Sequence, residues 1–309
     1  MFVSPFRIAA VVSATLLCLA PFTTRAFANA KVCRNQEQRY EQIEREATSI
    51  EINATLFSAA DKGCADLARR LLDKGASLEG RDRLGNKPLA RAAVAGELDL
   101  VTLFLDKGAP IDAQNIEGST ALFQAAEQGR LPVVQLLVER GANISLPGRN
   151  EITPLSAAAY MGSVPIVQLL ITNGADPKTS DKTEKAAIIY AAGRGFPAVV
   201  RLLLDQGIDV DAHYGNELTA LMWAAGYSDE AGVDDVMEVM TLFLDRGARI
   251  DDQDNRGRTA LMIAAELNHA AAVDLLLARG ADKTLKDKQG KTAGDLTSLT
   301  ALREKLAGQ

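Results

Sequence analysis

The sequence of 309 residues is 47% hydrophobic and carries a formal net charge of −6, which is typical of a folded, water-soluble protein. An acidic balance without a basic cluster argues against nucleic acid as a partner. Two histidines, His213 and His269, are too few for a histidine-based metal site or catalytic apparatus, so we expect no metal and no cofactor.

The first thirty residues have the three parts of a secretory signal peptide. Arg7 gives a short positive start, an apolar run of thirteen residues follows (8–20), and 28–30 read Ala-Asn-Ala, a small-x-small cleavage signature. A membrane anchor is the alternative, but thirteen residues are too few for a span, which needs about 20. Lipidation at Cys18 is a second alternative, although a large leucine precedes it. We predict cleavage of residues 1–30 and no membrane insertion afterwards.

Residues 31–50 are charged and rich in helix formers, which predicts a helix with Tyr40 and Ile43 on its inward side. The alternative is an arm that binds a partner. Removal of the signal peptide leaves two cysteines, Cys33 and Cys64, in an oxidising compartment, where an even pair favours a disulfide. Such a bond would contribute about 3–4 kcal/mol by the chain-entropy relation. Two unpaired thiols are the alternative.

A glycine followed by alanine or isoleucine returns along the chain at spacings of 33, 33, 33, 33, 40 and 33 residues. The glycines are Gly75, Gly108, Gly141, Gly174, Gly207, Gly247 and Gly280. A motif that ends in Ala-Ala precedes each of them, as in Thr120–Ala126, and a second apolar run comes between, as in Val199–Leu204. Self-similarity at this period predicts a stack of repeated units and not a globule around one core.

Each unit has the pattern of helix, turn, helix and loop. The threonine that begins most motifs can cap the first helix through its hydroxyl. Pro132, Pro165 and Pro197 suit the first turn of a second helix, where no amide donor is needed. The glycine after the second apolar run supplies the left-handed residue that ends it. One unit cannot bury the apolar sides of both helices, so neighbours must stack.

These residues resemble the ankyrin repeat family, whose signature is a Thr-Pro-Leu-His-x-Ala-Ala helix start, a Val-Val-x-Leu-Leu-Leu second helix and a Gly-Ala loop. The resemblance covers 51–309 and implies an all-α repeat solenoid with finger loops, capped by the helix over 31–50 and by a truncated final unit over 289–309. The seven ankyrin repeats of 51–288 are expected at 51–83, 84–116, 117–149, 150–182, 183–215, 216–255 and 256–288.

In the ankyrin fold the first helices and the finger loops line a concave side, so the resemblance implies that partners meet the residues around each Ala-Ala pair and the loop tips. In the fourth to sixth repeats these positions hold mostly aromatic side chains, which we predict to form a partner-binding patch. Its members are Tyr160, Met161, Tyr190, Tyr214, Trp223 and Tyr227. Tyrosine and tryptophan offer large contact area with few rotatable bonds. The alternative is that Tyr190 and Trp223 pack between repeats.

The sixth repeat carries seven extra residues between its two helices, and the insert is acidic without a basic residue. Its acids include Asp229, Glu230, Asp234 and Asp235. It could meet a basic partner or bind calcium weakly, although the calcium-loop pattern is not met. The alternative is a longer, solvated second helix with acids near its start, where the helix dipole favours them.

The chain has no Gly-x-Ser-x-Gly elbow, phosphate-binding loop or Cys-x-x-Cys motif, so we expect no enzyme. The signal peptide resembles those of Gram-negative bacteria. We therefore expect a monomeric periplasmic module that binds a periplasmic or envelope protein through its concave groove. An inhibitor or immunity protein that blocks an enzyme or toxin is the alternative, and a hydrolase that uses carboxylates of the insert is a distant one.

Overall fold

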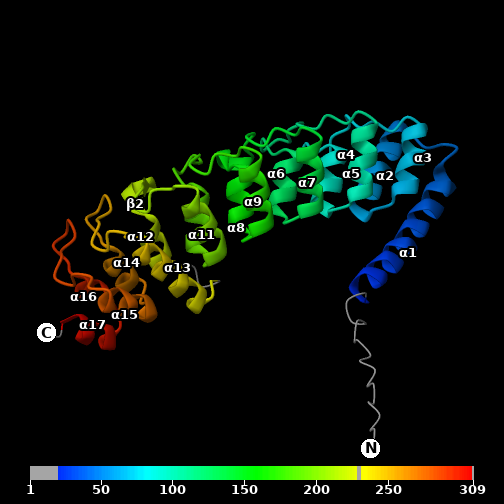
Figure 1. Ribbon diagram of the computed structural model, residues 1–309. Helices are drawn as coiled ribbons and strands as arrows, with labels where there is room; N and C mark the ends of the chain where they lie inside the picture. The colour runs from blue at the N-terminus through cyan, green and yellow to red at the C-terminus, as the bar shows by residue number, and fades with distance from the viewer. Residues whose placement is uncertain (1–19, 228–230, 308–309) are drawn as a thin grey trace, which may run out of the picture.

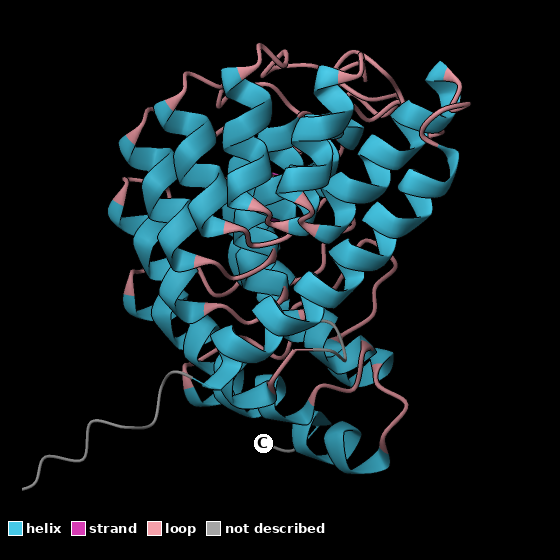
Figure 2. Ribbon diagram, turned by 90° about the vertical axis from the view of Figure 1, so that its right-hand side faces the viewer, coloured by secondary structure: helices cyan, strands magenta, loops and turns pink. Residues whose placement is uncertain are grey.

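A computed structural model describes residues 20–227 and 231–307. Helices stand side by side in a long row, and loops project along one edge of that row (Figure 1). The view at right angles looks along the row and shows the helices stacked in layers (Figure 2). The predicted all-α solenoid is therefore confirmed.

After α1 (Ala20–Ile43), the α-helices come in pairs, each a first helix and a second helix, with a connection that is short except in the repeat that carries the insert. The pairs are α2 (Ser49–Lys62) and α3 (Ala65–Asp73), α4 (Pro88–Ala95) and α5 (Leu98–Asp106), α6 (Ala121–Glu127) and α7 (Leu131–Glu139), α8 (Pro154–Tyr160) and α9 (Val164–Thr172), α10 (Ala187–Gly193) and α11 (Pro197–Asp205), α12 (Ala220–Ala225) and α13 (Val233–Asp245), α14 (Ala260–Glu266) and α15 (Ala270–Ala278), and the short α16 (Ala293–Leu296) and α17 (Thr300–Ala307).

Finger loops join one pair to the next and contain little regular structure. Two 3-10 turns, η1 (Arg149–Glu151) and η2 (Gly215–Glu217), lie in them. One finger also holds two-residue strands, β1 (His213–Tyr214) and β2 (Leu218–Thr219), which pair antiparallel with Tyr214 opposite Leu218.

The local signals in the sequence act as expected. Thr120 and Thr153 accept hydrogen bonds from the backbone N–H three residues later, at 3.1 and 3.0 Å, and so cap α6 and α8. The seven glycines that follow the second helices all have φ between 78° and 97°, a left-handed conformation that only glycine adopts freely. Each repeat therefore fixes where its own helices begin and end.

The core runs continuously along the stack. The paired alanines of the first helices, such as Ala125 and Ala126, are fully buried, and their small side chains let neighbouring helices pack closely. Leucines and valines of the second helices, such as Leu137 and Val167, close the other side of the same core. Burial is shared between neighbours, which is why no single pair forms a domain alone.

The N-terminal segment differs from its prediction. Helix α1 ends at Ile43 and does not reach residue 50, because the chain turns there and α2 starts early, at Ser49. Thr48 and Glu51 form a capping box that sets this start, with Glu51 Oε2 accepting from Thr48 N at 2.8 Å. Tyr40 is 1% exposed, as predicted, whereas the prediction that Ile43 faces inward is wrong, since it is 39% exposed at the helix end.

The acidic insert lengthens the second helix of its repeat. Helix α13 has 13 residues, against nine in α11 and in α15, and Asp234 and Asp235 lie exposed in its first turn. Asp229 and Glu230 lie outside the described residues. Asp234 and Asp235 therefore lie on a longer second helix, as one of the two interpretations expected, and a role of the insert in binding a basic partner stays a prediction.

Within the described ranges, no helix combines the length and the apolar character that a membrane crossing requires. In the same part of the chain, no group of three or more His, Cys, Asp or Glu side chains is arranged to hold a metal ion.

Candidate functional site

First helices and finger loops together form one side of the stack, called the inner face below, and pockets open on it between neighbouring first helices. One of them, the aromatic pocket, has a volume of ≈ 330 Å³ and draws on α8, α10 and α12. It is lined by Tyr160, Lys185, Ile189, Tyr190, Gly193, Arg194 and Trp223.

Aromatic rings and cations alternate in the aromatic pocket. The rings of Tyr160 and Tyr190 meet edge to face, with centroids 6.1 Å apart and planes at 84°. The Arg194 guanidinium carbon lies 4.7 Å from the Tyr160 ring centroid, and Lys185 Nζ lies 4.7 Å from the Trp223 ring. Both distances are within the range of cation–π attraction, which holds the two charges at the mouth of the pocket.

A buried carboxylate next to the aromatic pocket holds one of its lining residues, Tyr190, in place. Asp181 is 8% exposed and accepts a hydrogen bond from the Tyr190 hydroxyl. Its other oxygen accepts from Thr183 N, Thr183 Oγ1 and Lys185 N at 2.7, 2.8 and 3.1 Å. Burial acts to raise the pKa of Asp181, but these hydrogen bonds outweigh it and hold that pKa below its usual value. Burial and the bond to Asp181 together raise the pKa of Tyr190 well above its usual value.

A second pocket, the apolar pocket, adjoins the first and shares Trp223 with it. Its volume is ≈ 340 Å³, and it lies between α12 and α14. It is lined by Leu218, Met222, Trp223, Gly226, Arg256, Arg258, Ile263, Glu266 and Leu267. The indole Nε1 of Trp223 is buried and has no hydrogen-bond partner among the described residues. The two pockets form a continuous stretch of the inner face with one tryptophan as their common wall.

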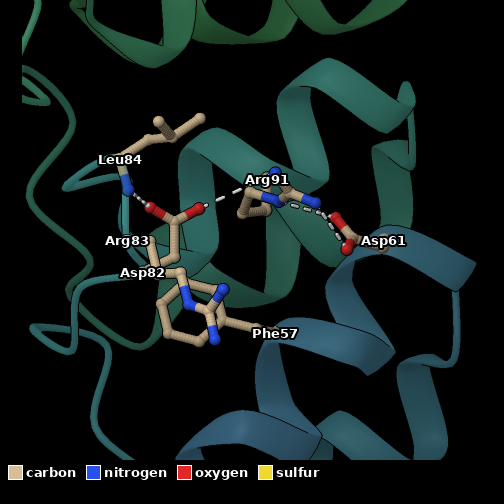
Figure 3. Close-up of a pocket in the computed structure, with 6 residues that line it drawn as sticks. All are labelled: Phe57, Asp61, Asp82, Arg83, Leu84 and Arg91. Carbon is tan, nitrogen blue, oxygen red and sulfur yellow. Dashed lines mark hydrogen bonds and ion pairs between the residues drawn. The ribbon is translucent and has the colours of Figure 1, made fainter.

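A third pocket, the N-terminal pocket, lies three repeats before the aromatic pocket and is lined mainly by charged side chains. Its volume is ≈ 290 Å³, and it is lined by Phe57, Asp61, Asp82, Arg83, Leu84 and Arg91 (Figure 3). Arg91 binds Asp61 through two hydrogen bonds of 2.8 and 2.7 Å and lies 3.7 Å from Asp82. The charges of Arg91 and the two aspartates are therefore paired with one another.

Comparison with known proteins agrees with this architecture. The family model "Ankyrin repeats (3 copies)" matches residues 56–148, 99–181, 155–234 and 189–287, which together span more than half of the chain. The chain belongs to the ankyrin repeat family. Among solved structures, the crystal structure of the human ASB11 ankyrin repeat domain is similar, with a TM-score of 0.64 and 26% sequence identity. That match covers 72% of this chain and 96% of the human one. No curated protein matches the sequence.

Three of the six residues predicted for the ankyrin groove line one pocket, namely Tyr160, Tyr190 and Trp223. Tyr190 and Trp223 are each half-buried and also line the pocket, so the alternative of packing fits them in part, and their role in binding a partner stays a prediction.

The other three predicted residues lie elsewhere. Met161 is 46% exposed but is not among the residues that line the aromatic pocket. Tyr214 is half-buried in the finger strand β1, where burial raises its pKa to about 12. Tyr227 stacks on His269 of the next repeat, with ring centroids 3.9 Å apart. The structure thus brings three of the six residues together in one pocket, and the binding patch itself stays a prediction.

Sequence reasoning missed Lys185 and Arg194, the two cations of the aromatic pocket. Neither has a periodic signature. A comparison of equivalent positions between repeats would have singled them out. The second repeat has the uncharged residues Asn86 and Ala95 at these positions, 99 residues earlier. Asp234 and Asp235 of the acidic insert line none of the three pockets described above.

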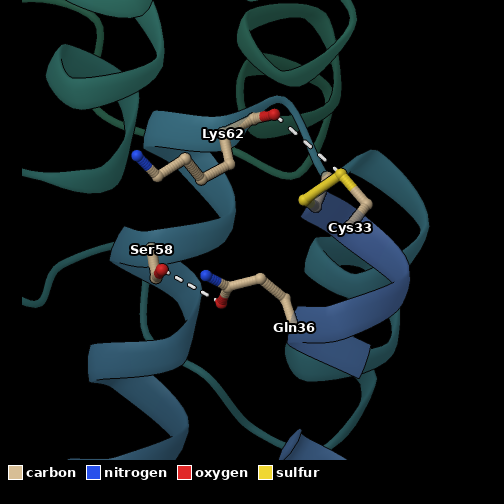
Figure 4. Close-up of a disulfide and its surroundings, with 5 residues drawn as sticks. Cys33, Gln36, Ser58 and Lys62 are labelled. Carbon is tan, nitrogen blue, oxygen red and sulfur yellow. Dashed lines mark hydrogen bonds between the residues drawn. A yellow bond between two sulfur atoms is a disulfide. The ribbon is translucent and has the colours of Figure 1, made fainter. Parts of the chain in front are cut away.

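The N-terminal helix lies against the first ankyrin repeat at the predicted cysteine pair. The sulfur atoms of Cys33 and Cys64 lie 2.09 Å apart and the Cα atoms 5.2 Å apart (Figure 4). Beside them, Ser58 Oγ donates to Gln36 Oε1 at 3.0 Å. A Cα separation of this size suits a disulfide without movement of the backbone.

Proposed function

We propose that this chain is an exported, non-enzymatic binding module that holds a protein partner on its inner face, in the aromatic and apolar pockets. Ankyrin repeat domains generally mediate protein–protein interaction, and the fold is typically not enzymatic. Partner binding is therefore the function that the family favours.

The observation that carries the proposal is the pair of adjoining pockets that share Trp223. Tyr160 is 42% exposed and Leu267 is 48% exposed, so each pocket offers apolar surface to a partner. Binding energy in protein interfaces is concentrated in tryptophan, tyrosine and arginine residues at such places. All three residue types line these two pockets.

We place the module in the periplasm of a Gram-negative cell. The proposal rests on the charge, apolar run and cleavage signature within residues 1–30, and is supported by two cysteines positioned to form a disulfide. A helix at one end of the stack and a shortened repeat at the other favour a monomer, because such caps cover the apolar face that an end repeat would otherwise expose.

The test begins with the full chain, tagged at its C-terminus and produced in a Gram-negative host. Mass spectrometry of the periplasmic fraction is expected to find Lys31 as the first residue and no free thiol. A chain that stays in the cytoplasm with its N-terminus intact would contradict export.

Partners are then captured from the same fraction with three versions of the chain. These are the wild type, Tyr160→Ala/Trp223→Ala, and Met161→Ala as the matched control, since Met161 is as exposed as Tyr160 but lies outside the pocket. We expect the wild type and the control to retain one protein that the double variant loses. Equal capture by all three would overturn the groove proposal. If the partner is an enzyme that the chain silences at equimolar amount, the module acts as an inhibitor.

A further inference from the structure

We propose that Cys33 and Cys64 form a redox latch that holds helix α1 on the first ankyrin repeat, and that a dithiol reductant opens this latch. In the reduced chain α1 leaves the stack, and the face of the first repeat that it covers becomes accessible. The inference rests on the export that the proposed function includes, because an oxidising compartment keeps such a cysteine pair closed. It concerns the N-terminal end of the stack and not the groove.

Helix α1 has a single apolar anchor in the core. Among the α1 residues whose exposure is described, 30–43, Tyr40 alone is buried. The nine-residue helix α3 buries three residues, and the eight-residue helix α17 at the other end of the stack buries Leu302 and Leu306. The N-terminal cap therefore places fewer side chains in the core than either of these shorter helices.

The hydroxyl of the same tyrosine opposes its burial. The Tyr40 oxygen is buried and has no hydrogen-bond partner among the described residues. A polar group that loses its water without gaining a partner lowers the stability of the docked state. The gain from burial of the Tyr40 ring is thus partly offset by its own hydroxyl.

The polar contacts of α1 add little to this anchor. Gln36 Oε1 accepts a hydrogen bond from Ser58 Oγ at 3.0 Å. Arg70 lies 3.4 Å from Glu41 and 3.5 Å from Glu44, and its side chain is 41% exposed. Exposed ion pairs of this kind contribute little to stability. Noncovalent contacts alone therefore hold α1 weakly.

The latch holds α1 at a second point along the helix. The chain continues from Ile43 into α2, whereas Cys33 meets Cys64 in the turn before α3 (Figure 4). When the latch opens, only the connection at Ile43 remains. Isolated helices shorter than about 12–15 residues are marginal in water, so we expect residues 31–43 to unfold on release.

The surroundings of the two sulfur atoms set the order of the exchange. Cys33 is partly exposed, and its Sγ lies 3.9 Å from the carbonyl oxygen of Lys62. Cys64 is 2% exposed and stands at the N-terminus of α3. A thiolate of the reductant therefore reaches Cys33 more readily, and the positive end of the α3 dipole favours negative charge on the departing Cys64 sulfur.

The reaction is a thiol–disulfide exchange in two steps. The attacking thiolate bonds to Cys33 Sγ, the bond between the cysteine sulfurs breaks, and Cys64 leaves as a thiolate that takes a proton from water. The second thiol of the reductant, as a thiolate, then attacks the sulfur of the reductant in this mixed disulfide and displaces Cys33, which is protonated in the same way. Two electrons pass to the chain, and the dithiol becomes a disulfide.

Hydrogen exchange followed by mass spectrometry tests the latch on the exported chain, purified in its oxidised form. Peptides from residues 31–43 report on α1, and peptides from α2 and α6 are the references. We expect dithiothreitol to accelerate exchange in α1 by about a hundredfold, to accelerate it less in α2, and to leave α6 unchanged. Unchanged exchange in α1 would overturn the proposal. Equal acceleration in α1 and α2 would also overturn it, because the repeat would then unfold together with its cap.

A matched pair of variants isolates the anchor. Tyr40→Phe keeps the ring and removes the unpaired hydroxyl, so after reduction its α1 should exchange about tenfold more slowly than that of the wild type. Arg39→Ala, at an exposed position beside Tyr40, is the control and should match the wild type. Faster exchange in reduced Tyr40→Phe would show that the hydroxyl supports docking, which contradicts a weak anchor.

Glutathione, a monothiol, traps the first step of the exchange. Acid quenching during partial reduction, followed by peptide mapping, should find glutathione on Cys33, and glutathione on Cys64 instead would overturn the proposed order.

The latch and the proposed function can fail separately. An exported chain whose two thiols stay free would overturn the latch and leave partner binding standing. A chain that is not exported, but that closes and opens the latch after treatment with glutathione disulfide and then dithiothreitol, would overturn export alone.

Discussion

The N-terminal pocket and the aromatic pocket occupy equivalent places three repeats apart. Asp61, Asp82 and Arg91 of the first correspond to Tyr160, Asp181 and Tyr190 of the second, each displaced by 99 residues. In the first set Arg91 forms an ion pair with Asp61, at 2.7 Å. In the second set Tyr160 and Tyr190 occupy the positions of Asp61 and Arg91, and their rings meet edge to face. Asp181 occupies the position of Asp82 and accepts a hydrogen bond from the Tyr190 hydroxyl.

This difference shows how the inner face of a repeat stack changes its chemistry through a few side chains. Arg91 pairs with two carboxylates within the protein. Tyr160 and Tyr190 instead place aromatic surface at two of these positions, and the Arg194 guanidinium lies against the Tyr160 ring. One or two side chains per repeat decide whether the charged groups of the inner face pair with one another or whether the face presents aromatic surface.

The largest expected effect tests whether the two regions are energetically independent. The variant Cys33→Ser/Cys64→Ala removes the proposed disulfide, which closes a loop with a sequence separation of 31. The chain-entropy relation predicts a loss of about 3–4 kcal/mol from the N-terminal repeats. Because each repeat contacts only its neighbours, partner capture that depends on Tyr160 and Trp223 should not change. Urea unfolding with segment-resolved hydrogen exchange measures the first effect, and partner capture measures the second.

Reduction of the wild type with dithiothreitol is the control, and it should reproduce the effect of the double variant. Equal acceleration of hydrogen exchange in α2 and in α12 would show that the stack unfolds as one unit. That result would contradict the separation of the two regions.

A smaller effect compares the cations of the two pockets. Arg91→Ala leaves Asp61 and Asp82 without their shared partner, and the half-exposed site suggests a cost of about 1–2 kcal/mol. Lys185→Met removes a cation–π contact near the surface and should cost less than about 1 kcal/mol. In partner capture the order is reversed, and only the Lys185 variant should retain less of the partner, because Lys185 lines the aromatic pocket. Urea unfolding and partner capture with both variants verify this crossover, and its absence would show that the pockets do not differ in role.

The fold could be predicted from the sequence because its signals are local and agree with one another. Capping threonines, prolines in first turns and left-handed glycines return in phase, so each repeat specifies its own helices. The N-terminal segment lacks this repetition. There the capping box of Thr48 and Glu51 decided the boundary, and Ile43 was placed on the wrong side.

The site could be predicted only in part. Tyr190 and Trp223 hold the same position in successive repeats, and Tyr160 lies on the helix before them, so they were expected together. Met161 follows Tyr160 by one residue, which turns the side chain by about 100° around the helix and out of the pocket. Tyr227 lies past the end of α12, beside the insert, where the repeat register no longer applies. Its stacking on His269 depends on three-dimensional structure alone.

Acid should destabilise the aromatic region through Asp181. Its folded-state pKa lies below the ordinary value of 3.8, so its contribution to stability is present above that value and is lost as pH falls through the folded-state pKa. Asp181→Asn should therefore be less stable than the wild type by about 1 kcal/mol at pH 7, and the two should converge as the pH falls below about 3.8. Urea unfolding at a series of pH values tests this expectation.

Tyr190→Phe is the control, because removing one hydrogen bond to the carboxylate should move the acid transition to higher pH. Parallel curves for all three chains would contradict the role of Asp181.

The smallest expected effect concerns Trp223, which occupies the position in the sixth repeat that Arg91 occupies in the second. Its indole Nε1 is buried without a hydrogen-bond partner among the described residues, and an unsatisfied buried donor costs about 1–3 kcal/mol. Trp223→Phe removes that donor and also some apolar contact, so the two changes should offset each other to within about 1 kcal/mol. Thermal unfolding followed by circular dichroism measures the result, with Arg91→Ala alongside as the case in which a paired group is lost. A loss above about 2 kcal/mol for Trp223→Phe would mean that the indole N–H has a partner such as an ordered water. Near-neutral stability together with weaker partner capture would show that the indole serves binding and contributes little to stability.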